Sequence, residues 1–197
     1  MRIFDYVVSR ADVDANRIVI MGRSLGSVMA VHVAARRSSR AVVLVSPLDS
    51  MVDLGRCHHP YLPVSLLLRH RFEAIADAPG ARMPLLAVVS TLEGIVPVEH
   101  SRRLIGACAG PSTWREISGA DHSNISDSPG YWNAIAEFLV QMRGLLKTAA
   151  VEVMYILKSL DVPARTSGSR IALSASAAAA PPRLRFWSDA GGISERY

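Results

Sequence analysis

The chain has 197 residues, of which 50% are hydrophobic and 20% are charged. This composition can form a packed core and excludes disorder of the whole chain. The net charge is +5, but the basic residues are scattered, so nucleic-acid binding, which needs a basic stripe with aromatic partners, is not predicted. Two cysteines cannot form a disulfide framework, which favours a reducing, cytoplasmic location. No stretch reaches the roughly 18 uncharged apolar residues of a membrane-spanning helix.

Apolar runs alternate with helical patterns along the first two thirds of the chain. Short runs rich in Val, Ile and Leu are typical of buried strands, and the last of them alternates like an edge strand. The predicted strands are 17–21, 41–45, 85–89 and 113–117. The predicted helices are 2–10, 24–37, 98–107 and a short one at 64–69 within an otherwise irregular stretch, 48–82. This order predicts βαβ units and a three-layer α/β/α sandwich with a mainly parallel sheet.

The strongest helical pattern lies near the end of the predicted core. Apolar residues recur at steps of three and four from Tyr131 to Leu146, which predicts a helix with one apolar face. The same spacing continues more weakly through residues 153–160 and ends at Pro163. Runs rich in Ser, Ala, Gly and Pro then follow, and such runs cannot bury a core. The sequence therefore predicts a folded domain over 1–160 and a disordered tail over 161–197.

A motif of chemical interest follows the first predicted strand: Gly22-Arg23-Ser24-Leu25-Gly26. A G-x-S-x-G sequence between a strand and a helix forms a tight turn that exposes the serine hydroxyl at the edge of the sheet. Side chains at positions 22 and 26 would collide with the neighbouring chain, which explains the glycines. The Leu25 N–H, at the start of the helix, is predicted to face an oxyanion formed at Ser24.

A serine nucleophile needs a base, and the base needs an acid that orients it. His122 follows the fourth predicted strand and Glu93 follows the third. Ser24, Glu93 and His122 would therefore lie at the same edge of a parallel sheet, where ligands bind in such folds. Asp49, after the second strand, is an alternative to Glu93 as the acid. Arg23 has two open interpretations, a contact with an anionic substrate group or an ion pair with a surface carboxylate.

Several motifs together resemble the C-terminal half of an α/β-hydrolase, in the branch of Bem46-type proteins and protein-depalmitoylating hydrolases. The resemblance covers about Arg10 to Val140. The matching segments are Gly22–Ser27, Ser46-Pro47, Tyr61–Val64 with Arg71–Glu73, Gly94–Pro97, and Gly119–Asn124 with Gly130–Trp132. The first segment resembles the turn bearing the nucleophile, and the second and third together resemble the cap-side segment. Gly94–Pro97 resembles the loop bearing the acid, and the last pair resembles the histidine loop with the final helix. The family usually has aspartate at the position of Glu93.

The resemblance also implies that the family's first four strands precede residue 1. The loop after the third of these would donate the other oxyanion N–H, and losing one such donor costs about 10²–10³ in turnover. Without these strands, residues 17–21 would form a bare sheet edge open to self-association. The chain is therefore predicted to be a truncated α/β-hydrolase.

Two functions are compatible with these features. The first is a serine hydrolase that cleaves a carboxylic ester, thioester or amide with a triad of Ser24, His122 and Glu93, with Leu25 in the oxyanion hole. It requires no metal or organic cofactor and takes a small-molecule or acyl substrate. The alternative is a truncated, non-catalytic remnant that acts, if at all, as a protein-binding module.

Overall fold

In the computed structural model, residues 2–143, 152–156, 184–187 and 193–196 are described. Their strands form one sheet with the order β4-β3-β2-β1-β5-β6-β7, in which only the β6–β7 pair is antiparallel. The strands are β1 (Ile18–Arg23), β2 (Ala41–Val45), β3 (Leu85–Ser90), β4 (Ser112–Ile117), β5 (Glu152–Ile156), β6 (Leu184–Trp187) and β7 (Ile193–Arg196). The four predicted strands are confirmed as β1 to β4, and these four are parallel to one another.

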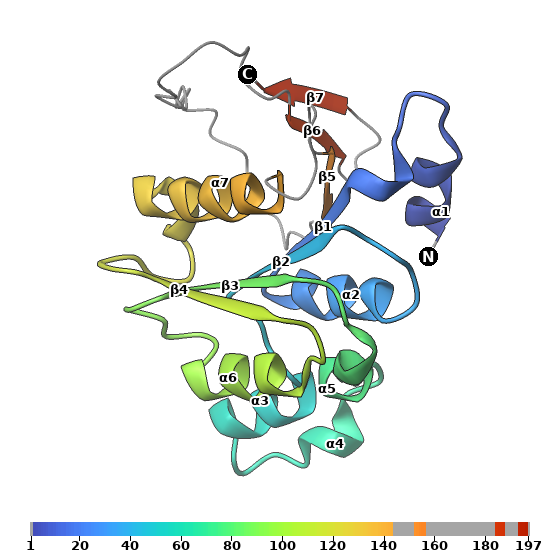
Figure 1. Cartoon of the computed structure of the whole chain (residues 1–197). Coiled ribbons are helices and arrows are strands. Elements are labelled where there is room, and N and C mark those ends of the chain that lie inside the picture. Colours follow the sequence, from blue (N-terminus) through green and yellow to red (C-terminus); the bar gives the residue numbers. More distant parts are fainter. Residues whose placement is uncertain (1, 144–151, 157–183, 188–192, 197) are drawn as a thin grey trace.

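Helices connect these strands and cover both faces of the sheet. They are α1 (Arg2–Ser9), α2 (Leu25–Ala34), α3 (Met51–His58), α4 (Val64–Leu67), α5 (Ala74–Asp77), α6 (Val98–Ala107) and α7 (Pro129–Arg143). Figure 1 shows α7 on one side of β1–β4 and α2 and α6 on the other. No helix in the described part of the chain is long and apolar enough to span a membrane.

The alternation of strand side chains produces two separate apolar cores. Ile18, Ile20 and Leu44 point to the face covered by α2, α5 and α6. Val19 and Met21, in the intervening positions of β1, pack with apolar residues of α7 on the opposite face. Because strand residues point alternately to opposite sides, the consecutive apolar residues at 18–21 of β1 and throughout β2 require helices on both sides. The predicted three-layer α/β/α sandwich is therefore confirmed.

The prediction of a bare edge at 17–21 is wrong. In the structure β5 lies beside β1 in parallel, with Ile18 opposite Glu152 and Gly22 opposite Ile156. The helical spacing predicted through 153–160 is also wrong at residues 153–156, which belong to β5. Val, Tyr and Ile favour strands, and the open hydrogen-bonding edge of β1 supplies their backbone partners.

The segment 161–197 differs from its prediction in two places. Strands β6 and β7 lie within it, although its composition favours disorder. Its remaining residues, and residues 144–151, lie outside the described part of the chain. For them, and for the boundary at residue 160, the sequence-based interpretation stays a prediction.

Helix α3 lies in a stretch that was predicted to be mostly irregular. Its N-cap is Ser50, whose side chain accepts a hydrogen bond from the Asp53 N–H. A serine followed three residues later by an acid is a sequence signal for a helix start. This signal could therefore have located α3 from the sequence.

Candidate active site

Ser24 occupies a strained turn between β1 and α2. Its backbone has φ 51° and ψ −123°, a region that residues other than glycine rarely adopt. The Ser24 N–H donates to the Val45 carbonyl at 2.8 Å, which fastens the turn to the end of β2. A Cβ atom on Gly22 would lie 2.4 Å from the Gly26 carbonyl oxygen. The predicted collision at position 22 is thus confirmed, and it shows how closely the backbone folds back on itself at Ser24.

The first turn of α2 starts directly after Ser24. The Ser24 side chain makes no capping hydrogen bond to this helix, so its hydroxyl is not used for local structure there. Leu25 is the first residue of α2, and the first N–H groups of a helix have no acceptor within the helix. These groups also carry the partial positive charge of the helix N-terminus. The turn therefore places a hydroxyl next to donors suited to an anion.

His122 and Glu93 form a close pair at the same edge of the sheet. His122 Nδ1 lies 2.8 Å from Glu93 Oε1. The side chains of His122 and Glu93 are 14% and 6% exposed. The same Glu93 oxygen accepts from the N–H groups of Ile95 and Val96, each at 3.1 Å, and the Ser90 hydroxyl donates to Oε2 at 3.1 Å. The carboxylate is therefore held in one orientation toward the imidazole.

The electrostatics of Glu93 favour the ionised carboxylate. Burial raises the pKa of Glu93, but the hydrogen bonds from His122 and from the Val96 N–H outweigh this effect and hold its pKa at about 2. Hydrogen bonds to a carboxylate favour its charged form. At neutral pH Glu93 therefore presents a negative charge to the ring nitrogen of His122.

This low pKa predicts a specific dependence of stability on pH. The ordinary pKa of a glutamate is 4.5, so Glu93 stabilises the fold fully above that pH and progressively less as the pH falls toward 2. Between about pH 5 and pH 2.5, the free energy of unfolding is expected to fall more steeply for the native chain than for Glu93→Gln. Urea unfolding of both proteins across this range measures the difference. Parallel curves for the two proteins would contradict the assignment.

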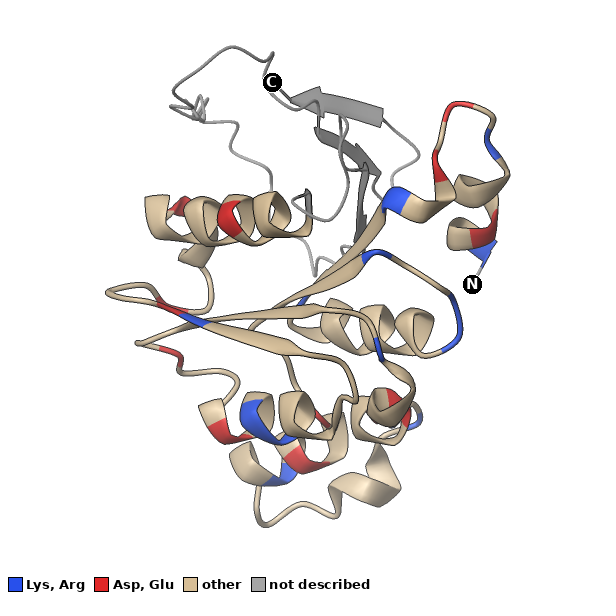
Figure 2. Ribbon diagram, viewed as in Figure 1, with Lys and Arg blue, Asp and Glu red and all other residues tan. Residues whose placement is uncertain are grey.

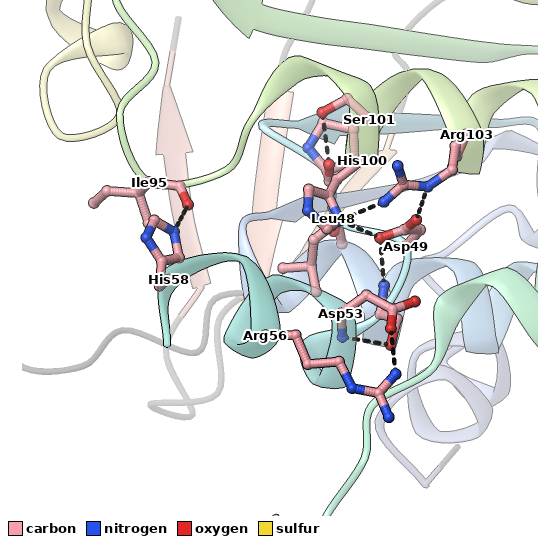
Figure 3. Close-up of polar contacts among 12 residues, drawn as sticks. Leu48, Asp49, Asp53, Arg56, His58, Ile95, His100, Ser101 and Arg103 are labelled. Atoms are coloured by element: carbon pink, nitrogen blue, oxygen red, sulfur yellow. Dashed lines mark hydrogen bonds and ion pairs between the residues drawn. The ribbon is translucent and has the colours of Figure 1, made fainter. Parts of the chain in front are cut away.

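Asp49, the alternative acid, is engaged elsewhere. Asp49 Oδ1 lies 2.6 Å from His100 Nδ1, and the Arg103 guanidinium donates to Oδ2 at 2.6 Å (Figure 3). Both partners belong to α6. The Ser50 N–H also donates to Oδ1, at 2.7 Å. The structure therefore brings Glu93, and not Asp49, to His122.

Arg23 has a role that the sequence did not predict. Its guanidinium donates to the carbonyl oxygens of His122 and Ser123, the latter at 3.1 Å. In the described part of the chain it forms no ion pair with a carboxylate, which was one of its two predicted roles. The other, a contact with an anionic substrate group, stays a prediction. The residue directly before Ser24 therefore ties the histidine loop to the end of β1.

The histidine loop is also fixed from within. Asp121 accepts hydrogen bonds from the N–H groups of Ser123 and Asn124 at 2.7 Å and 3.0 Å. The Asn124 side chain accepts in return from the Asp121 N–H at 2.8 Å. Such side-chain to backbone bonds are typical of tight turns. His122 thus sits in a loop whose backbone is held by its neighbours and by Arg23.

Comparisons with known proteins agree with this architecture, although no family model matches the chain. An uncharacterized protein of Mycobacterium tuberculosis, Rv2307c, is 32% identical over 139 residues, which cover 70% of this chain and 50% of that protein. Human alpha/beta hydrolase domain-containing protein 17B is 26% identical over 133 residues, which cover 68% of this chain and 45% of the human protein. The chain spans about half the length of the curated relatives it matches.

Solved structures show the same fold. The acetyl xylan esterase from Paenibacillus sp. R4 superposes with a TM-score of 0.59 at 21% identity, covering 71% of this chain and 50% of the esterase. At this level of identity the likeness concerns the fold. Over about 70% of its length, the chain belongs to the α/β-hydrolase superfamily, as a partial match to the branch that contains alpha/beta hydrolase domain-containing protein 17B.

Proposed function

We propose that this chain is a serine hydrolase that cleaves a carboxylic ester, thioester or amide. Ser24 Oγ attacks the carbonyl carbon, and His122 accepts the serine proton and then donates it to the leaving group. Glu93 orients His122 and stabilises the imidazolium that forms. The Leu25 N–H donates to the oxyanion. Water then attacks the acyl-enzyme, with His122 again as the base, and releases the acid and the free serine.

The observation that carries this proposal is the buried Glu93–His122 pair, with its separation of 2.8 Å. A carboxylate that is ionised and fixed by backbone N–H groups sets the tautomer of the imidazole, leaving Nε2 free to act as a base. The contact from Arg23 to the His122 carbonyl further supports the proposal, because Arg23 is the neighbour of Ser24. Both loops are thereby drawn together at the carboxyl ends of β1 and β4.

The rival function is a truncated, non-catalytic remnant, and it has lost the predicted route by which it would bind a partner. It depended on an open hydrogen-bonding edge at residues 17–21, and β5 occupies that edge.

Hydrolysis of an activated ester tests the proposal. The purified chain is expected to hydrolyse a short-chain p-nitrophenyl ester faster than free solution does, and Ser24→Ala is expected to lose about 10³-fold or more of that rate. Ser112→Ala, an exposed serine at the start of β4, is the matched control and is expected to keep full activity. Equal rates for the native chain and Ser24→Ala would contradict the proposal.

Arg23 offers a second test of the same site. If its guanidinium holds the histidine loop, Arg23→Met is expected to lower kcat by about 10–100-fold with little change in KM, since small misplacements of catalytic groups are costly. Arg23→Lys, which keeps the charge and can still donate to one carbonyl, is expected to recover part of kcat. A rise in KM with unchanged kcat would instead indicate that Arg23 binds the substrate.

A further inference from the structure

The last residue of α3 contacts the loop that carries Glu93, residues 91–97, which is called the acid loop. His58 Nε2 lies 2.7 Å from the Ile95 carbonyl oxygen (Figure 3). A carbonyl oxygen only accepts hydrogen bonds, so His58 carries a proton on Nε2 and donates it. Helix α3 follows β2, and the acid loop follows β3. This hydrogen bond therefore joins the segments that follow two neighbouring strands.

The peptide group that His58 contacts also holds Glu93. The Ile95 carbonyl and the Val96 N–H belong to the same planar peptide group. The Val96 N–H and the Ile95 N–H each donate to Glu93 Oε1 at 3.1 Å. The same oxygen lies 2.8 Å from His122 Nδ1. A continuous chain of hydrogen bonds therefore runs from His58 through this peptide group and Glu93 to His122.

The other restraints on this part of the acid loop are weak. The loop has one acidic residue, Glu93, and no Lys or Arg (Figure 2). Within the loop, neutral N–H groups hold the carboxylate, and the strength of such hydrogen bonds depends on their alignment. Ile95 is 48% exposed, so packing fixes it only in part. The hydrogen bond from His58 therefore supplies a restraint that the packing of Ile95 does not.

We propose that His58 is a positioning residue for the Glu93–His122 pair. Its hydrogen bond fixes the peptide group after Ile95 and polarises it, which strengthens the Val96 N–H as a donor to Glu93, because hydrogen bonds in a chain polarise one another. Since His58 is exposed, this bond contributes little to the stability of the whole fold, and its effect is local. The effect on turnover rests on the proposed function, whereas the positioning of the pair does not.

Proton NMR of the full chain tests the positioning directly. The Nδ1–H of His122, held on the Glu93 carboxylate, is expected to give a low-field resonance that is absent from His122→Ala. His58→Phe removes the donor and keeps a flat ring; the resonance is expected to move upfield and broaden, because a less fixed carboxylate holds the proton more weakly. His58→Gln can still donate to the Ile95 carbonyl and is expected to restore the native resonance. His59→Phe changes the adjacent histidine, which is also exposed, and is the matched control.

Ester hydrolysis by the same variants measures the consequence for turnover. His58→Phe is expected to lower kcat for a p-nitrophenyl ester about tenfold, with KM unchanged within about twofold, because the histidine is less well aligned with its acid. His58→Gln is expected to recover most of kcat, and His59→Phe to keep the native value. Circular dichroism verifies that each variant is folded.

Three results would overturn the role of His58. They are a low-field resonance that His58→Phe leaves unchanged, an equal effect of His59→Phe on that resonance, and a rise in KM at native kcat, which would assign His58 to substrate binding. A native chain without the resonance would contradict the Glu93–His122 hydrogen bond and with it both proposals. A resonance that responds to His58→Phe in a chain that hydrolyses no ester would refute the hydrolase and leave the positioning intact.

Discussion

Glu93→Gln is expected to lower the kcat for ester hydrolysis by about 10⁴-fold, the order of loss seen when a triad carboxylate becomes an amide. The amide has nearly the same shape, but it cannot stabilise the imidazolium. Its N–H₂ group can also turn toward His122 Nδ1 and favour the wrong tautomer. Because Glu93 is buried against His122 at 2.8 Å, water cannot replace the missing charge. Steady-state kinetics with an activated ester measure the loss.

Asp49→Asn is the matched comparison for this prediction. Asp49 is the other carboxylate that follows a strand at this edge of the sheet, but its oxygens face His100 and Arg103. At a temperature where both proteins are folded, Asp49→Asn is expected to keep kcat within about tenfold of the native value. A larger loss of kcat in Asp49→Asn than in Glu93→Gln would reverse the assignment of the acid.

Asp49→Ala is expected to lower the free energy of unfolding by about 3–5 kcal/mol, the cost of breaking a buried charge pair. The Asp49 and His100 side chains are 4% and 6% exposed. Burial raises the pKa of Asp49, but hydrogen bonds from His100 and Arg103 lower it by more. These hydrogen bonds therefore stabilise the negative charge of the buried Asp49 carboxylate. Without it, His100 loses a buried partner, and the Ser50 N–H at the start of α3 loses its acceptor.

Arg103→Ala is the control for the Asp49 prediction. The Arg103 side chain is about half exposed, so its removal deletes one partner and leaves His100 beside the carboxylate. We expect a loss of about 1 kcal/mol, measured like that of Asp49→Ala by urea unfolding. A loss below about 1 kcal/mol for Asp49→Ala would mean that this cluster does not hold α3 and α6 together.

The strands β1 to β3 were predictable because each contains a short run of buried apolar residues, and β4 was predictable because its residues alternate as in an edge strand. Residues 41–45 are such a run, and β2 has the same bounds. Helix α3 was harder to find, because Gly55 and the charged residues around it break the apolar spacing. The spacing of three between Val153 and Ile156 also fits a helix, although these residues lie in the strand β5. Their strand depends on the vacant edge of β1, which is far away in the sequence.

The part of the candidate site that was predictable depends on two features: the order of its residues along the chain, and their position after strands that end at the same edge of the sheet. The sequence placed Glu93 and His122 after neighbouring strands, and the structure brings the two side chains together. The nucleophilic role of Ser24 stays a prediction. The contact of Arg23 with the histidine loop could not be predicted, because a long side chain can reach many acceptors and its partners are about a hundred residues away in the sequence.

The most direct test of the central claim is covalent labelling by a fluorophosphonate, which reacts with activated serines. One adduct is expected on the native chain, located at Ser24 by peptide mass spectrometry. The adduct is expected to be absent from Ser24→Ala and His122→Ala and unchanged in Ser112→Ala. A folded native chain that stays unlabelled, or labelling that persists in Ser24→Ala, would contradict a triad built on Ser24.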